Sequence, residues 1–290
     1  MRKVLRSKIV TWAGLLLIVA GCAEVPITGR RQLSLVPESL VTSMSLEQYN
    51  QFLAESKLSA DVQATAMVRN VGNRIVQAID QFYRERGEAN PVADYKWEFN
   101  LIADKTVNAW AMPGGKVVFY EGIIPVAQNE AGIATVMGHE IAHVVAGHGS
   151  ERMSQALLVQ MGGMALSTAL SQRPEATQQL FMTAYGLGGQ IGVLLPYSRL
   201  HENEADRLGM IFMAMAGYHP QEAASFWQRM SAVKGAGAQP PEFLSTHPAD
   251  ATRIRNLQEL IPEAMEYYRP AGGQKQAPSA AQTILPPAIK

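Results

Sequence analysis

Residues 131–148 read A-G-I-A-T-V-M-G-H-E-I-A-H-V-V-A-G-H and contain the motif His139-Glu140-x-x-His143. Most other positions in the stretch are apolar, as expected of a helix buried in a core. Residues four apart lie on the same face of a helix, so the two imidazoles can bind one metal ion. Glu140 lies about 100° round the helix, where a carboxylate can act as general base on a metal-bound water. The stretch predicts a metal-binding helix; the alternative is a buried helix whose histidines only form hydrogen bonds.

The first 21 residues are typical of a secretory signal, with a positive segment followed by a short apolar run. Val19-Ala20-Gly21-Cys22 resembles the signal of bacterial lipoproteins, in which the cysteine is lipidated and becomes the mature N-terminus. The acyl chains of a lipidated cysteine would attach the protein to a membrane. The alternative is an ordinary signal peptide followed by an unmodified thiol. Residue 23 is alanine rather than the aspartate that usually retains lipoproteins in the inner membrane, so we expect the outer membrane, facing the periplasm.

The composition of the mature chain excludes some classes of function. Cys22 is the only cysteine, so no intramolecular disulfide can form. Four of the 25 basic residues lie in the signal, whereas all 25 acidic residues lie after it. The mature chain is therefore mildly acidic. Without a basic tract we expect no nucleic-acid binding. We expect a tether over residues 22–37, one domain over 38–262, and a disordered tail rich in Pro, Ala, Gln and Gly over 263–290.

Helices and a small sheet are predicted before the metal-binding helix. Apolar residues recur at helical spacing within 38–57 and 60–86, and strand patterns occupy residues 97–102 and 116–120. The segment between the strands contains four residues typical of a turn and its approach: Asn108, Pro113, Gly114 and Gly115. An edge strand beside a metal site is a candidate platform for an extended peptide substrate, which would add by backbone hydrogen bonds. An ordinary hairpin is the alternative.

Two apolar stretches, 157–170 and 180–195, flank a polar break over 171–179. Neither reaches the length needed to span a bilayer, so we expect a buried or surface-docking helical hairpin. Its Met-rich flank is a candidate contact for a partner or an unfolded substrate, with plain core packing as the alternative.

A third metal ligand is predicted after this hairpin. Glu202 and Asp206 are four residues apart and share one face of a predicted helix. A catalytic zinc site with two histidines needs a third protein ligand and an open position, and a carboxylate from a separate helix is suitable. Asp206 would then hold a ligating histidine through its other ring nitrogen. The alternative is a solvated acidic face.

A helix is predicted over 221–234, and a Gly/Pro-rich segment follows it at 235–241. Beyond lie His247 and a short helix that contains Arg253. A segment bounded by Gly and Pro in this way can act as a lid, and a surface loop is the alternative.

Together these motifs resemble the zinc metallopeptidases related to the CAAX prenyl endopeptidase, the family of HtpX-, Oma-, BepA- and LoiP-like proteins. The resemblance covers roughly residues 22–260. The motifs that match are His139-Glu140-x-x-His143, S-R-x-x-E-x-E-A-D at 198–206, N-A-x-x-x-P-G-G at 108–115, S-T-H-P at 245–248 and P-I-T-G-R-R-Q-L at 26–33. Because the chain ends at Lys290, soon after the lid helix, it looks nearest to short periplasmic lipoproteins such as LoiP.

The resemblance implies a role for each matching residue. His139, His143 and Glu202 would bind one zinc ion per chain, and Glu140 would activate water. Asp206 would contact a ligand, and His247 would be a lid histidine that can approach the zinc and hold the site closed. His247 and Arg199 are candidates for stabilising the oxyanion. The other three histidines, which have no such role, are expected to be structural or on the surface: His148, His201 and His219.

The fold expected from the resemblance is α+β and mainly α: a gluzincin-like zinc metallopeptidase domain with a small β-sheet beside the active-site helix. The expected function is endoproteolysis of misfolded or misassembled envelope proteins, with peptide extended along the strand before Pro113 and outer-membrane assembly machinery as a candidate partner. The alternative is a lipid-anchored chaperone or assembly scaffold whose zinc site is latent. A purely structural zinc site would require His247 to close the tetrahedron permanently.

Overall fold

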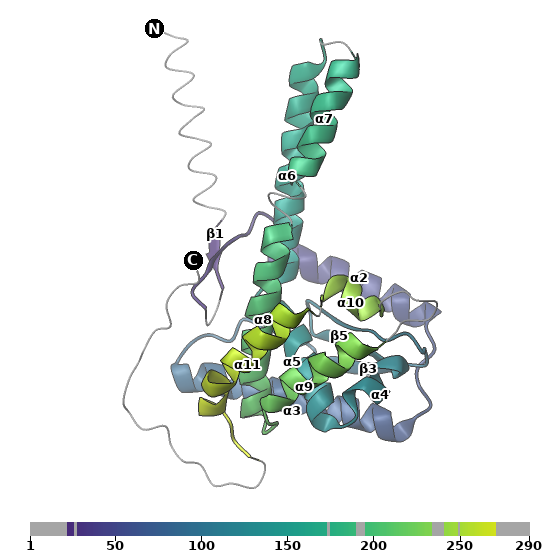
Figure 1. Cartoon of the computed structure of the whole chain (residues 1–290), viewed down its shortest axis with the longest axis vertical. Helices are drawn as coiled ribbons and strands as arrows, with labels where there is room; N and C mark the ends of the chain where they lie inside the picture. The colour runs from purple at the N-terminus through teal and green to yellow at the C-terminus, as the bar shows by residue number, and fades with distance from the viewer. Residues whose placement is uncertain are drawn as a thin grey trace. The chain divides into compact units, whose positions relative to one another are not determined.

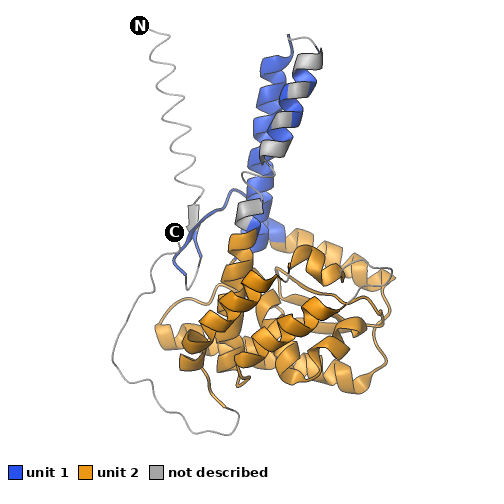
Figure 2. Cartoon of the chain, viewed as in Figure 1, with its two compact units in different colours: residues 1–41, 147–198, 286–290 blue, residues 42–146, 199–285 orange. Residues whose placement is uncertain are grey.

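The computed structural model describes residues 22–25, 28–172, 175–189, 195–233, 241–248 and 250–270. The chain divides into two compact units (Figure 2). Unit 1 comprises residues 1–41, 147–198 and 286–290, and unit 2 comprises residues 42–146 and 199–285. The predicted signal and most of the predicted tail lie outside the described residues. Within the described ranges, no helix has the length and apolar character needed to cross a membrane.

Unit 2 is mainly helical with a small sheet, which confirms the predicted α+β fold class (Figure 1). The two early helices, both strands, the metal-binding helix and the helix of the third ligand all form where the sequence predicts them. The elements of this unit, including two helices (α2 and α8) that begin in unit 1, are α2 Glu38–Glu55, α3 Val62–Arg86, β3 Glu98–Ile102, β4 Ala109–Met112, β5 Lys116–Tyr120, η1 Glu121–Ile123, α4 Ile124–Ala127, α5 Glu130–Val145, α8 Leu195–Met215, α9 Gln221–Ala232, α10 Glu242–Thr246 and α11 Ala251–Glu266.

The sheet has the order β3-β5-β4, so β4 lies at an edge. β5 runs parallel to β3 and antiparallel to β4, with Trp110 opposite Val118. The predicted turn joins β4 to β5, and Gly114 and Gly115 have φ angles of 89° and 83°, which favour glycine. β4 contacts α5. The edge strand is therefore beside the metal-binding helix, as the platform hypothesis requires.

Helix α5 is fixed at its start and buried along its length. The Asn129 side chain accepts a hydrogen bond from the Gly132 amide at 3.0 Å and caps the helix. Every residue from Gly132 to Val145 is buried. α5 meets α8 through two glycines, because a Cβ at Gly138 would lie 2.7 Å from the Gly209 carbonyl oxygen. This close approach brings the helix of the histidines against the helix of Glu202.

Unit 1 contains a strand pair and a helical hairpin. β1 (Cys22–Glu24) pairs antiparallel with β2 (Arg31–Leu33), so the predicted tether is partly ordered. The reason is local: Gly29 allows the turn with φ 65°, and the Arg30 guanidinium binds Glu151 at 2.7 Å. The predicted helical hairpin consists of α6 (His148–Leu170) and α7 (Glu175–Gly189). The polar break is shorter than the predicted 171–179, because α7 already begins at Glu175.

Two further boundaries differ from the prediction. The single domain expected over 38–262 falls into two units, because the helical hairpin makes its contacts mostly within unit 1. Residues 263–266 of the expected tail are helical, because α11 continues to Glu266, and Glu263 pairs with Arg207 at 2.8 Å. The predicted Gly/Pro segment at 235–241 lies almost wholly outside the described residues.

Candidate metal centre

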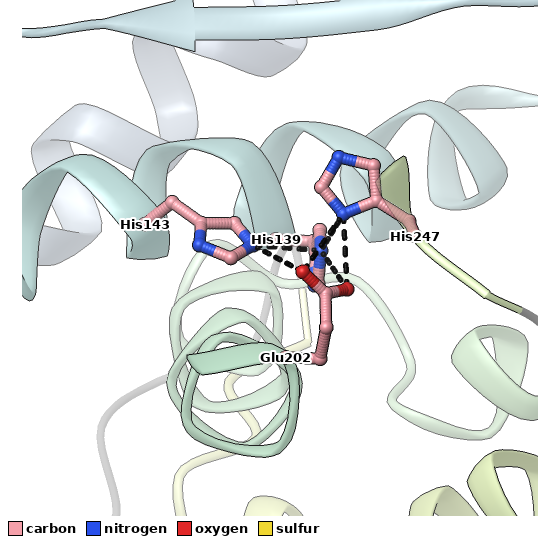
Figure 3. A group of neighbouring side chains, drawn as sticks. All are labelled: His139, His143, Glu202 and His247. Carbon is pink, nitrogen blue, oxygen red and sulfur yellow. Dashed lines mark hydrogen bonds and ion pairs between the residues drawn. The ribbon is translucent and has the colours of Figure 1, made fainter. Parts of the chain in front are cut away.

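Three elements bring four candidate ligands together (Figure 3). His139 and His143 extend from α5, Glu202 extends from α8, and His247 follows α10 directly. One ligand atom from each residue lies within 4.8 Å of the other three. All four residues are buried or nearly so, with relative exposures of 2–9%. The structure thus unites the three predicted ligands and adds the predicted lid histidine to them.

The separations of the ligand atoms fit a small tetrahedral metal ion. His139 Nε2 lies 3.1 Å from His143 Nε2, 3.0 Å from His247 Nδ1 and 3.3 Å from Glu202 Oε2. His143 Nε2 lies 3.3 Å from the other Glu202 oxygen, and His247 Nδ1 lies 2.9 Å from Oε2. Ligand atoms at zinc–nitrogen distances of about 2.0–2.1 Å stand roughly 3.3 Å apart around a tetrahedron. Nitrogen and carboxylate oxygen donors are those that zinc accepts, so this donor set fits zinc.

Glu140 lies beside the ligands without belonging to them. The residue is 4% exposed, and its Oε1 accepts no hydrogen bond from any group that the structure describes. His247 Nε2 lies 3.4 Å from this oxygen. A buried carboxylate oxygen without a donor is costly. Such an oxygen next to a metal site is suited to accept a proton, as the sequence predicts for this residue.

Asp206 occupies the position expected from its spacing. Its Oδ1 lies 2.9 Å from Nδ1 of His139, on the opposite edge of the ring from the ligand atom Nε2. A carboxylate at Nδ1 fixes the orientation and tautomer of a ligating histidine. Asp206 thereby holds His139 with Nε2 directed at the other ligands.

The structure reveals Arg253, whose contacts with the metal centre the sequence did not indicate. Its guanidinium donates to both Asp206 oxygens, from Nη2 at 2.7 Å and from Nε at 2.8 Å, and lies 3.1 Å from Glu202 Oε2. The same group stacks on Trp227, 3.5 Å from the ring centroid, and donates to the Pro248 carbonyl. The sequence does hold one signal that could have pointed to Arg253. It lies four residues before the buried Leu257, so an arginine falls on the apolar face of α11.

The charges around the ligands set their pKa values in the metal-free protein. Burial opposes charge on His139, but hydrogen bonds and charges from Asp206 and Glu202 outweigh it and raise the pKa of this imidazole to about 9. Burial lowers the pKa of His143 to about 3, helped by the positive charges of His139 and His247. Burial raises the pKa of the Glu202 and Asp206 carboxyl groups, but their partners lower it by more. The pKa of Glu202 is held below its usual range by the histidines, and that of Asp206 chiefly by Arg253.

We therefore expect zinc binding to release one proton from His139. A histidine with a pKa of about 9 is protonated at neutral pH, and it must be neutral to bind a metal. His143, with a pKa of about 3, is already neutral and should release none. Between pH 6 and pH 8 the zinc affinity should rise about tenfold per pH unit. Chelator competition measures this slope, and calorimetry in buffers of different ionisation enthalpy counts the proton; a pH-independent affinity would contradict the assignment.

The other predicted residues have different surroundings. Asn108 donates to Glu242 of α10 at 3.1 Å, while Pro113, Gly114 and Gly115 form the β4–β5 turn. Arg199 is exposed on α8 and does not belong to the ligand cluster. The Cys22 side chain lies outside the described part of the chain. Among the described residues, the three histidines without a predicted role do not belong to the ligand cluster. His148 and His201 are buried, and His219 is exposed.

Comparison with known proteins gives one matching family model, described as peptidase family M48, over residues 63–261. The mitochondrial metalloendopeptidase OMA1 of Schizosaccharomyces pombe is 33% identical over 243 residues, which cover 83% of this chain and 66% of that protein. The human metalloendopeptidase OMA1 is 27% identical, covering 83% and 46%. A putative beta-barrel assembly-enhancing protease of Vibrio cholerae is 31% identical, covering 66% and 38%. The chain thus spans about two thirds of the length of these relatives or less.

Proposed function

Because the chain belongs to peptidase family M48, whose model matches residues 63–261, we propose that it is a zinc-dependent metalloendopeptidase of the bacterial cell envelope. Membership of this family confirms the resemblance inferred from the sequence motifs. The observation that carries the proposal is the junction of four buried ligands with a buried carboxylate, Glu140, that is not one of them. A purely structural metal site has no use for such a group.

Each residue has a distinct part in the proposed reaction. His139, His143 and Glu202 would hold the zinc, and Asp206 keeps His139 in its ligating orientation. Zinc supplies Lewis-acid chemistry, since it lowers the pKa of water and polarises a carbonyl. Glu140 would accept the proton of the attacking water and return it to the leaving amine. With His247 Nδ1 in the fourth ligand position the site is closed, so cleavage requires this histidine to withdraw.

The proposed substrates are misfolded or misassembled envelope proteins. The relatives named metalloendopeptidase and beta-barrel assembly-enhancing protease support a protein substrate and, for the bacterial member, a link to β-barrel assembly. The edge strand β4 offers free backbone groups to an extended peptide next to α5. We further propose that lipid on Cys22 anchors the mature chain to the outer membrane, facing the periplasm and its assembly machinery.

Removal of the metal is the direct test of this function. Purified mature protein should cleave casein, lose this activity on incubation with a chelator, and regain it when about one equivalent of zinc per chain is added back. Circular dichroism before and after chelation separates loss of metal from loss of fold. Cleavage that persists in a protein shown to be free of zinc would overturn the proposal.

A lipid-anchored chaperone or assembly scaffold is the second candidate function. The observation in its favour is the filled ligand set, because His247 Nδ1 contacts both Glu202 oxygens at 2.9 and 3.1 Å. A site closed in this way is latent until the lid opens. A scaffold would bind client proteins equally well with or without a functional Glu140, whereas a protease would not cleave without it.

A further inference from the structure

The helical hairpin of unit 1 leaves an apolar stripe without a partner in the described chain. Leu157, Met161 and Met164 of α6 are 37%, 52% and 56% exposed. Their spacing of four and then three residues puts them on one face of the helix. Leu158, beside this face, is 52% exposed, as is Phe181 of α7 at 51%. We call the face of Leu157, Met161 and Met164 the outer face of α6.

The outer face is not the surface that joins the two helices. Tyr185 of α7 donates its hydroxyl to the Val159 carbonyl at 2.9 Å. Its ring covers Gly162 and Gly163, where a Cβ at Gly162 would clash with the tyrosine hydroxyl. These α6 positions lie roughly opposite the stripe, at about 100° per residue. The hairpin is thus packed on its inner face while the apolar outer face stays exposed.

Between its base, where Glu151 and Arg152 lie, and Arg173 and Glu175 at the break between its helices, the hairpin carries no charged residue. Residues 153–172 and 176–189 contain no Asp, Glu, Lys or Arg. A helix that lies on a protein surface in water normally carries charges opposite its apolar face, and a protein-docking patch has a polar rim. Neutral side chains on every side instead suit a surface that takes up apolar groups and offers no net charge. A bilayer of zwitterionic phospholipid is such a surface.

The chain also fastens the proposed lipid anchor to the base of this hairpin. β1 begins at Cys22, which is opposite Leu33 of β2. The loop between the strands is bound to α6 through Arg30, whose guanidinium makes two hydrogen bonds to Glu151, at 2.7 and 3.0 Å. After β2, the amides of Leu35 and Val36 donate to Ser154 Oγ. Acyl chains on residue 22 would therefore bring α6 to the lipid surface in which they insert.

From these observations we propose that the outer face of α6 is a second membrane contact, which inserts into zwitterionic phospholipid beside the Cys22 anchor. The proposal rests on the lipid attachment of Cys22 in the proposed function. A second contact would fix the orientation of unit 1 on the membrane, since one flexible anchor alone leaves the unit free to rotate. Binding comes from apolar burial without cationic side chains. Added salt should not weaken it, and anionic lipid should not strengthen it.

The test uses the zinc-loaded mature chain with Cys22→Ser, which has no lipid and no other cysteine. Met161→Cys in this background carries a single environment-sensitive fluorophore, and Val62→Cys, at an 81% exposed residue of unit 2, is the matched control. Vesicles of phosphatidylethanolamine and phosphatidylcholine should shift the emission of the Met161 probe to the blue, and brominated acyl chains should quench it, while the Val62 probe is unchanged. Met161→Glu should weaken vesicle partitioning at least about tenfold, and Val62→Glu should not.

Several outcomes would overturn the proposal. One is an unshifted Met161 probe at saturating vesicle concentration in protein that retains its circular dichroism and zinc. A blue shift that depends on protein concentration without vesicles would indicate that a second copy of the chain covers the face. A shift that appears only with unfolded casein would indicate a substrate contact. Casein cleavage by the same samples reports the proposed function separately, so failure of one is distinguishable from failure of the other.

Discussion

Casein cleavage should fall by about 10²–10⁴-fold in Glu140→Gln, while the protein still binds one zinc ion per chain. General base catalysis contributes typically 10²–10⁴-fold, and the amide keeps the size of the carboxylate but cannot accept the proton. Glu140 Oε1 accepts no hydrogen bond from any described group, so loss of the carboxylate should leave the neighbouring residues in place. The ligands His139, His143 and Glu202 are untouched by the change.

The closed position of His247 has to be considered in this experiment. Its Nδ1 lies 3.0 Å from His139 Nε2, and in the proposed mechanism this closed arrangement slows the wild type, so the loss caused by Glu140→Gln should be largest where His247 is removed. Glu140→Gln is therefore best measured in the wild type and again in His247→Ala, which removes the fourth ligand. We expect His247→Ala to cleave faster than the wild type and the double variant to be inactive. Zinc content and thermal melting of each variant serve as controls.

The result separates the two candidate functions. Equal cleavage by His247→Ala with and without Glu140→Gln would show that Glu140 is not the base. No cleavage by any variant, with zinc bound in all of them, would favour the chaperone or scaffold. In that case client binding, measured as suppression of aggregation of an unfolded outer-membrane protein, should be the same in wild type and Glu140→Gln.

The sequence predicted the elements that depend on local pattern. Helical spacing of apolar residues gave α3, alternation gave β3, and the spacing of His139, His143, Glu202 and Asp206 gave the centre of the site. These signals are local because a helix places residues four apart on one face whatever lies around it. The sequence also indicated His247 through a short motif, although only the structure places its Nδ1 among the ligands.

The features that were missed depend on contacts between distant segments. Gly138 and Gly209 matter because α5 and α8 cross there, and neither glycine is informative alone. The pairing of β1 with β2 depends on Arg30, which reaches Glu151 across 121 positions of sequence. Arg253 belongs to the same class, because only the packing of α11 against α8 brings its guanidinium to Asp206. Periodicity shows which face of a helix is buried and leaves open what that face will meet.

Replacement of Arg253 should therefore destabilise both the fold and the metal site. Asp206 is 5% exposed and Glu202 9%, so Arg253→Ala takes from two buried carboxylates the guanidinium that pairs with both of them. Removing one partner of a buried ion pair costs about 3–5 kcal/mol. We expect the free energy of unfolding of the metal-free protein to fall by about that amount. Loss of the group that orients a ligand's partner should also weaken zinc binding about 10–100-fold.

Two companion variants identify the cause of the loss. Arg253→Lys keeps the charge, but an ammonium group cannot reach Asp206 and Glu202 together while stacking on Trp227, so it should recover only part of both effects. Arg207→Ala removes the other ion pair between α8 and α11, where Glu263 is 34% exposed, and should cost at most about 1 kcal/mol. Urea unfolding in chelator and chelator competition for zinc measure the two quantities.

If Arg253→Ala loses no more stability than Arg207→Ala and binds zinc as the wild type does, Arg253 fills space beside Trp227 and does not hold the ligands. If instead both fall and Arg253→Lys lies between, the guanidinium is what ties α11, and with it the segment that carries His247, to the metal centre.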